Sequence, residues 1–208
     1  MRRERPAIKT CPGVIACCAG YGKSAYLAQL SHEHADSVLI SLKAYDDCPE
    51  RIAAIFGEYT TGFSGCGGYE TVCRFIEDMS ARDGLVLVDD ADVVTDKTAS
   101  AFMTLLCEAA VSGKIRLLMT GRSIPAFALN FVMNGSAALY GIDEMRFTRA
   151  ETEEYLKLCG REYDDIYVNT LYAFTDGWCA GVSELAGTAV SDEEITKCVE
   201  RTFLGRYI

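Results

Sequence analysis

The 208 residues suffice for one α/β domain and a smaller lobe, because a chain of this length buries roughly 70% of its unfolded surface. Half of the residues are hydrophobic and 24% are charged, which excludes an intrinsically disordered chain. The formal net charge of −10 argues against direct binding to DNA, for which a basic surface is typical.

Short apolar runs alternate with helical stretches as far as Phe147. Such alternation predicts an α/β fold with a doubly wound parallel sheet. The run at 85–90 is apolar and ends in two acids, as expected of a parallel strand that is covered on both faces. The expected strands are 14–19, 37–42, 85–90, 115–121 and a weaker 138–142, and the expected helices are 23–34, 51–59, 69–80 and 98–111.

Only helices are expected after Phe147. Two segments have the spacing of a capping box, in which a hydroxyl and a carboxylate close the start of a helix reciprocally. We therefore expect a core over 1–147 and a small helical lobe over 148–208, left incomplete where the segment FLGRYI at 203–208 barely begins an apolar helix. The capping pairs are Thr148 with Glu151 and Ser191 with Glu194.

The segment GYGKS follows an apolar strand and opens a helix, which is the setting of a phosphate-binding loop. Lys23 is expected to meet the β- and γ-phosphates of ATP or ADP, and the Ser24 hydroxyl to bind Mg²⁺. Cys17 stands where the strict pattern has a glycine, and a turn that carries GKS without binding anything is the alternative. The expected nucleotide-binding residues are Ala19, Gly20, Tyr21, Gly22, Lys23, Ser24 and Ala25.

Two acids stand where the apolar run 85–90 ends. Asp89 is expected to hold Mg²⁺, partly through water, beside Ser24. Asp90 is a candidate catalytic group that polarises the attacking water. Asp92 is expected to be a solvated or helix-capping group. The alternative for Asp89 and Asp90 is that aspartate is common in turns after strands.

Six segments resemble, in order, the ATPase domain of the large LuxR-type transcription regulators similar to MalT, within the STAND class of P-loop NTPases. CCAGYGKSAYLAQL resembles the phosphate loop (Walker A), and SVLISLKAYDDCPERIAAIF the second strand with its following helix. LVLVDDADVV resembles the Walker B strand, and RLLMTGRSIPAFAL the sensor strand. DEMRFTRAETEEYL and FTDGWCAGVSEL resemble two markers of the helical lobe.

The resemblance implies roles for two further segments. Arg122 matches a sensor arginine that contacts the terminal phosphate, which makes it a second catalytic candidate; the alternative is a pair with a loop carboxylate. The segment 176–181 matches a Gly-Trp-x-x-Gly element that packs near the nucleotide from the helical side. For Trp178 alone, a place in the apolar core is the favoured reading.

The resemblance implies a switch in which ADP holds a resting form and ATP an assembling one, with slow ATP hydrolysis as the reset. The partners implied are the adenine nucleotide and either a second copy of the chain or effector and regulator domains, without direct DNA binding by this chain. The alternatives are a nonfunctional or purely interacting fragment of such a regulator and a small P-loop kinase.

Ten cysteines without a signal peptide predict reduced thiols and a cytoplasmic protein that does not enter a membrane. A structural zinc site is not expected, because no C-x-x-C pair occurs and the histidines are His32 and His34 alone. The glycine-rich segment 62–68 follows a helix and not a strand, so it is expected to be a flexible connector.

Overall fold

A computed structural model describes residues 12–60, 67–160 and 164–186. Their contacts divide them into two compact units. The first contains 12–17 and 23–141, and the second contains 18–22 and 142–186. The predictions for the capping pair Ser191 and Glu194, for the end of the lobe and for most of the glycine-rich segment fall outside the described residues.

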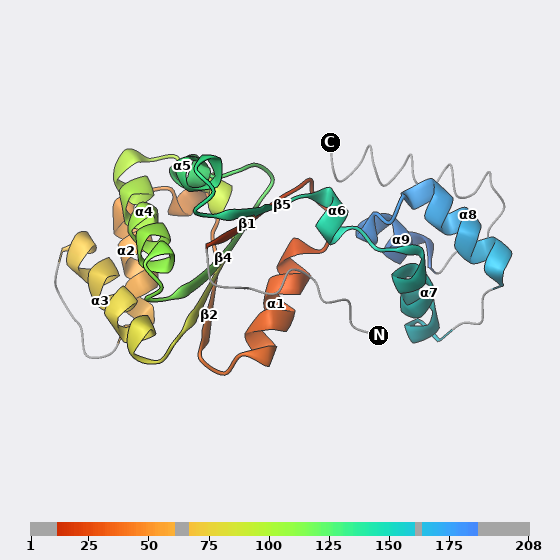
Figure 1. The fold of residues 1–208 in the computed structure, drawn as a ribbon, viewed down its shortest axis with the longest axis horizontal. Helices are drawn as coiled ribbons and strands as arrows, with labels where there is room; N and C mark the ends of the chain where they lie inside the picture. The colour runs from red at the N-terminus through yellow and green to blue at the C-terminus, as the bar shows by residue number, and fades with distance from the viewer. Residues whose placement is uncertain (1–11, 61–66, 161–163, 187–208) are drawn as a thin grey trace. The chain divides into compact units, whose positions relative to one another are not determined.

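The first unit is built on a five-stranded, all-parallel sheet with the order β2-β3-β4-β1-β5 (Figure 1). The predicted parallel sheet is thereby confirmed. Leaving β1, the chain crosses to the far edge at β2, returns strand by strand, and adds β5 on the other side of β1. The strands are β1 (Gly13–Ala16), β2 (Ser37–Ser41), β3 (Leu85–Asp89), β4 (Arg116–Gly121) and β5 (Ala138–Tyr140).

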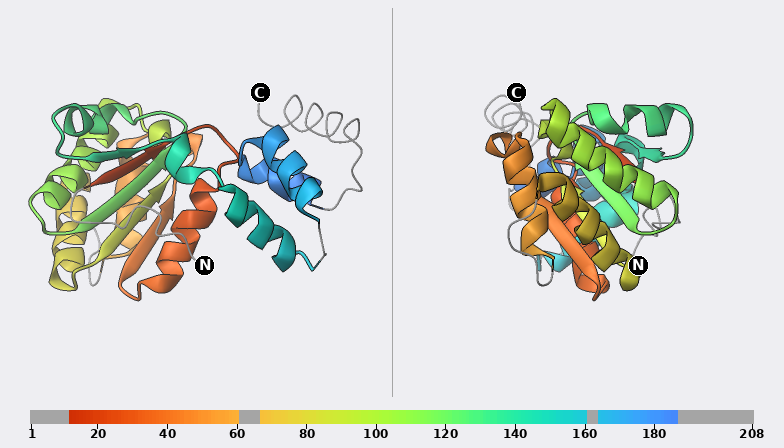
Figure 2. Two further views of the ribbon diagram at one scale, coloured as in Figure 1. Left: turned by 45° about the vertical axis from the view of Figure 1, so that its right-hand side comes forward. Right: turned by 90° about the vertical axis from the view of Figure 1, so that its left-hand side faces the viewer.

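Helices cover both faces of this sheet (Figures 1 and 2). Val86 and Val88 of β3 pack in a core with α2, α3 and α4, and the alternation of a strand turns Leu85 and Leu87 to the other face, where α1 contacts β3. All of β3 is buried, as its apolar sequence predicted. The helices are α1 (Lys23–Glu33), α2 (Pro49–Glu58), α3 (Gly68–Ala81), α4 (Lys97–Val111) and α5 (Leu129–Met133), with short 3₁₀ turns at Ala44–Asp46, Ala91–Val93 and Ala126–Ala128.

Two element ends differ from the sequence prediction for local reasons. Strand β1 ends at Ala16 and not at residue 19, because Ala16 pairs with Gly121, the last residue of the neighbouring strand β4. Helix α2 begins at Pro49, two residues before the predicted start. Proline suits the first turn of a helix, since its φ is already helical and its missing N–H is not needed there.

The second unit contains helices around a small apolar core of its own. The predicted capping box is present: the Thr148 N–H donates to Glu151 Oε2 at 2.7 Å, and the Glu151 N–H donates to Thr148 Oγ1 at 3.2 Å. Leu156, Leu171 and Val182 are among the residues at the centre. Within the described parts of both units, no helix is long and apolar enough to cross a membrane. The helices are α6 (Ile142–Met145), α7 (Arg149–Leu158), α8 (Asp165–Thr175) and α9 (Cys179–Leu185).

Candidate functional site

The carboxyl ends of β1, β3 and β4 lie at one edge of the sheet, since parallel strands present the same ends together. The first unit therefore brings Asp89, Asp90 and Arg122 to the edge at which β1 ends. Lys23 lies at the same edge, because its ammonium bonds the carbonyl of Cys17, the residue that follows β1. Four of the residues predicted to form the site thus share one edge.

Lys23 is the first residue of α1 and is only 7% exposed. Its Nζ donates a hydrogen bond of 2.6 Å to the backbone oxygen of Cys17. The Cys17 side chain is itself buried, at 4% exposure, so the residue that replaces the expected glycine packs inward. Ser24 and Ala25 follow on α1 with exposed side chains. A helix that begins here adds the partial positive charge of its first turn to that of the ammonium.

Asp89 ends β3 with a carboxylate that is 7% exposed. The hydroxyl of Thr120, on the neighbouring strand β4, donates a short hydrogen bond to Asp89 Oδ1. The N–H of Asp90 donates to the same hydroxyl at 3.4 Å. The second oxygen of Asp89 accepts no hydrogen bond from the described residues. Thr120 was not predicted; its signal was a hydroxyl residue directly after the apolar residues 117–119.

Asp90 has left-handed backbone angles, with φ 56° and ψ 40°. Aspartate tolerates this region better than most residues do, but the conformation still costs free energy and is enriched where function requires it. The residue is half-buried, and its carboxylate makes no hydrogen bond or ion pair within the described chain. A carboxylate with unused acceptor oxygens is suited to orient a water molecule.

Asp92 does not cap a helix, which was one of the two roles expected for it. Asp92 Oδ2 accepts hydrogen bonds from the Arg122 N–H at 3.0 Å and from the Ser123 N–H at 3.3 Å. The carboxylate therefore caps the segment that follows β4, and it does not cap a helix. The guanidinium of Arg122 is exposed, and among the described residues it forms no ion pair, so the predicted alternative of a pair with a loop carboxylate does not occur there.

The segment 18–22 belongs to the second unit, where the start of α9 holds it by its carbonyl groups. Trp178 Nε1 donates to the oxygen of Ala19 at 3.1 Å, and the thiol of Cys179 lies 3.5 Å from the oxygen of Tyr21. Between them, the N–H of Ala180 donates to the oxygen of Gly20 at 2.9 Å. Trp178 is buried, as favoured from the sequence, but its indole N–H also has a specific partner.

Different structural constraints require glycine at positions 20 and 22. Both Gly20 and Gly22 have positive φ, at 85° and 79°. A Cβ on Gly20 would in addition lie 2.3 Å from Trp178 Nε1, whereas a Cβ on Gly22 would meet nothing closer than 3.8 Å. Gly20 is therefore required by both backbone and packing, and Gly22 by backbone alone.

The chemical types at the sheet edge fit a phosphate ester with a divalent cation. Lys23 and Arg122 supply positive charge, and Arg122 can offer a planar fork of donors. The Ser24 hydroxyl and the second oxygen of Asp89 are hard oxygen ligands of the kind that Mg²⁺ prefers. No group of three histidine, cysteine or acidic residues that could hold a metal ion occurs among the residues described.

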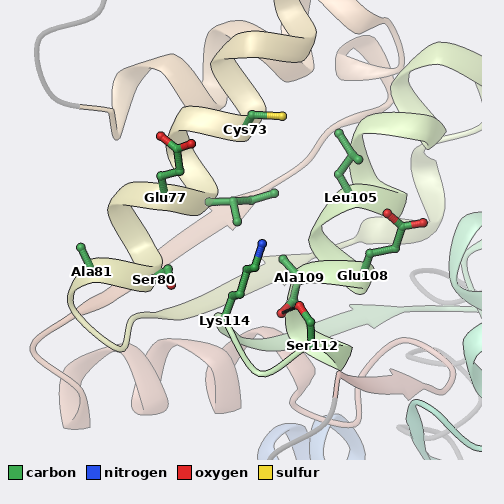
Figure 3. A pocket seen from close by; sticks show the side chains of 10 residues that line it. Cys73, Glu77, Ser80, Ala81, Leu105, Glu108, Ala109, Ser112 and Lys114 are labelled. Atoms are coloured by element: carbon green, nitrogen blue, oxygen red, sulfur yellow. Dashed lines mark hydrogen bonds between the residues drawn. The ribbon is translucent and has the colours of Figure 1, made fainter.

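A hollow of about 740 Å³ lies between α3 and α4, away from these residues (Figure 3). Its lining includes Cys73, Glu77, Leu105, Glu108 and Lys114. Lys114 shortly precedes β4, so this end of the hollow is near the amino edge of the sheet, opposite the edge with Asp89. The charged and hydroxyl groups of the candidate site converge at the other edge of the sheet.

No protein-family model matches the sequence, and no curated protein matches it either. Several solved structures share its fold. A STAND protein with a tetratricopeptide repeat sensor from Pyrococcus horikoshii has a TM-score of 0.62 and 13% identity, over 95% of this chain and 32% of that one. A Walker-type ATPase of Pyrococcus abyssi has a TM-score of 0.60 and 12% identity, over 92% and 66%. AMPPCP-bound DnaA from Aquifex aeolicus has a TM-score of 0.50 and 12% identity, over 96% and 57%.

These similarities establish that the chain has the fold of the P-loop ATPases, a STAND protein among them. The chain spans about a third of the length of the Pyrococcus horikoshii protein and less than two thirds of the DnaA chain. Identities of 12 to 13% carry the fold and not the residue roles.

Proposed function

We propose that this chain binds ATP or ADP with Mg²⁺ through the residues 19–25, and that it acts as the nucleotide-dependent switch of a STAND-class regulator of the MalT-like LuxR type. Slow hydrolysis to ADP and phosphate, with Asp90 orienting the water, resets the switch. Lys23 and Arg122 bind the phosphates, while Ser24 and Asp89 hold the Mg²⁺, Asp89 partly through water.

The orientation of three peptide groups is the observation that carries this proposal. The carbonyls of Ala19, Gly20 and Tyr21 all point to residues 178–180. In a trans peptide the N–H of the next residue points the opposite way, and the described chain contains no cis peptide. The N–H groups of Gly20, Tyr21 and Gly22 are therefore directed away from α9. Successive N–H groups that point to one side of a loop can surround a phosphate.

The ammonium of Lys23 supports the same function. It bonds a neutral carbonyl at the end of β1, at the place where the loop begins. A phosphate oxygen is a stronger acceptor for an ammonium, because charge-assisted hydrogen bonds are roughly twice as strong as neutral ones. We expect the ammonium to exchange the Cys17 oxygen for phosphate when a nucleotide binds.

The membership of the loop in the helical unit supports a switch. Residues 18–22 belong to that unit, whereas Lys23, Asp89 and Arg122 belong to the sheet unit. In the proposed switch, the chain is in equilibrium between a resting state and an assembling state, and the bound nucleotide shifts that equilibrium. A ligand shifts such an equilibrium only through different affinities for its states, and a third phosphate that reaches Arg122 supplies that difference between ATP and ADP.

Calorimetric titration with ATP and ADP, with and without Mg²⁺, tests the proposal. We expect Lys23→Ala to weaken binding at least about tenfold, the loss of one charge-assisted contact to phosphate. Lys114→Ala is the matched control, because Lys114 is an exposed lysine near the opposite edge of the sheet. Equal affinities for the wild-type chain and Lys23→Ala, or no binding by the wild-type chain, would contradict the proposal.

A further inference from the structure

One carboxylate oxygen joins the segments that follow β3 and β4. Asp92 Oδ2 accepts from the Arg122 N–H at 3.0 Å, from the Ser123 N–H at 3.3 Å and, more weakly, from the Ser123 hydroxyl at 3.5 Å. All three donors belong to two consecutive residues. A charged acceptor makes such bonds stronger than a neutral acceptor does. The backbone at Arg122 is therefore fixed by a side chain from the neighbouring loop.

The other oxygen of Asp92 packs against Gly121. A Cβ built on Gly121 would lie 2.7 Å from Asp92 Oδ1 and 2.7 Å from the Ser123 oxygen, so no larger residue fits there without movement. The φ of Gly121 is not among the positive values. Gly121 is thus required for close approach and not for backbone conformation, and the carboxylate lies directly against the end of β4.

Among the described residues, no group bonds the guanidinium of Arg122. Its position therefore depends on the backbone from which the side chain extends. Asp92 is an acid close to an arginine, yet it bonds the backbone of Arg122, and no described residue pairs with the guanidinium. The backbone position from which the Arg122 side chain leaves the sheet edge consequently depends on the bonds to Asp92. The Thr120 hydroxyl ties the same two strands together one step earlier, at Asp89.

We propose that Asp92 is a positioning residue, which fixes the backbone of Arg122 so that the guanidinium meets the terminal phosphate of ATP. The inference rests on the proposed function, in which Arg122 distinguishes ATP from ADP. Asp92 itself touches no phosphate. Its loss lowers the affinity for a triphosphate and leaves the affinity for a diphosphate unchanged.

The test compares the affinities for ADP and for the non-hydrolysable triphosphate AMPPCP, both with Mg²⁺, by calorimetry. In Arg122→Ala we expect AMPPCP to bind on the order of tenfold more weakly and ADP as in the wild type. Asp92→Ala is expected to lose most of the same preference. Asp92→Asn keeps an oxygen that can accept both N–H groups, so it is expected to retain most of it.

A double-mutant cycle separates positioning from a general structural effect. If Asp92 acts through Arg122, then Asp92→Ala has no further effect on AMPPCP in the Arg122→Ala background. Asp92→Glu keeps the charge but displaces it by one methylene, so we expect this variant also to lose the preference for AMPPCP over ADP. It replaces Asp92→Ala in the cycle if Asp92→Ala does not fold.

Two results separate the failure of this inference from that of the proposed function. A wild-type chain that binds neither nucleotide overturns both. A wild-type chain that prefers AMPPCP, with the preference lost in Arg122→Ala but kept in Asp92→Ala and Asp92→Glu, overturns the positioning role alone. Additive losses from Asp92→Ala and Arg122→Ala overturn it as well, because two residues that act through one contact cannot add.

Discussion

The indole N–H of Trp178 donates to the backbone oxygen of Ala19 at 3.1 Å, although the two residues are 159 positions apart. This bond ties the segment between β1 and α1 to the first turn of α9. Because a buried indole N–H needs a partner, the bond and the burial of the ring stabilise the same arrangement. The environment of the only tryptophan therefore includes the loop that we propose to bind phosphate.

Nucleotide binding is expected to change the fluorescence of Trp178. The emission of an indole depends on its hydrogen bond and on its access to water, and both depend on the loop segment 18–22. Since the chain has one tryptophan, any change is assigned without ambiguity. Titration with ATP and ADP should give a saturable change that is absent in Lys23→Ala. Calorimetric binding with unchanged emission and lifetime would leave a nucleotide binder without coupling to α9.

Replacing Gly20 by alanine is expected to disrupt the loop far more than the same change elsewhere. The new Cβ would lie 2.3 Å from Trp178 Nε1, in addition to the strain of a positive φ. Gly113 has φ 75° and open space around its Cβ position, so Gly113→Ala isolates the backbone strain, about 1–2 kcal/mol. Urea unfolding measures both variants. A loss of stability in Gly20→Ala no larger than that in Gly113→Ala would show that the contact with Trp178 is not tight.

The two neighbouring acids are expected to differ in their effects. Asp89→Asn should weaken the Mg²⁺ dependence of ATP binding, because it removes charge from the buried carboxylate, one oxygen of which accepts no hydrogen bond from the described residues. Asp90→Asn should bind ATP normally and slow hydrolysis by a factor on the order of 10²–10⁴, the contribution typical of a general base. Phosphate release and calorimetry distinguish the two. A Mg²⁺ effect abolished by Asp90→Asn alone would mean that the roles are reversed.

Acid is expected to release the link between the loop after β2 and the start of α4. Partial burial acts to raise the pKa of Asp47, but hydrogen bonds from the Asp96 N–H and from the Thr95 hydroxyl and N–H outweigh it and lower the pKa. The stabilisation from a lowered pKa is present above the unfolded-state pKa and is lost as the pH falls through the folded-state pKa. Asp47→Asn should therefore destabilise the chain near neutral pH and have a smaller effect in acid.

Urea unfolding of the wild type and of Asp47→Asn at both pH values measures this difference. Asp36→Asn is the control, because Asp36 is exposed and its side chain makes no hydrogen bond within the described chain. A destabilisation by Asp47→Asn that is equally large in acid would show that the ionised carboxylate is not what stabilises the link.

The elements of the sheet unit were predictable because their signals are local. The buried strand β3 is a continuous apolar run, and α1 starts where glycines give way to helix formers. The capping pair Thr148 and Glu151 was also readable, since both partners lie within one turn of each other. Chain order and apolar spacing alone thus led to the parallel sheet and to the edge at which the candidate residues lie.

The partners of those residues were decided by the tertiary structure. Asp92 and Arg122 are 30 positions apart, and nothing in the local sequence distinguishes a carboxylate that caps a neighbouring loop from a solvated one. Thr120 was one polar residue directly after an apolar run until its hydroxyl was found against Asp89. The spacing of apolar residues indicates helices and strands, but it does not indicate which side chains meet at the edge of a sheet.

The sequence by itself determined that a glycine turn and a lysine connect a strand to a helix, because positive φ and helix starts are properties of a few adjacent residues. Only the tertiary structure decided that 18–22 pack with the helical unit and Lys23 with the sheet unit. That division depends on bonds from Trp178 and Ala180 to carbonyls far away in the chain. Every residue carries a carbonyl, so no side-chain pattern marks which of them will be bound.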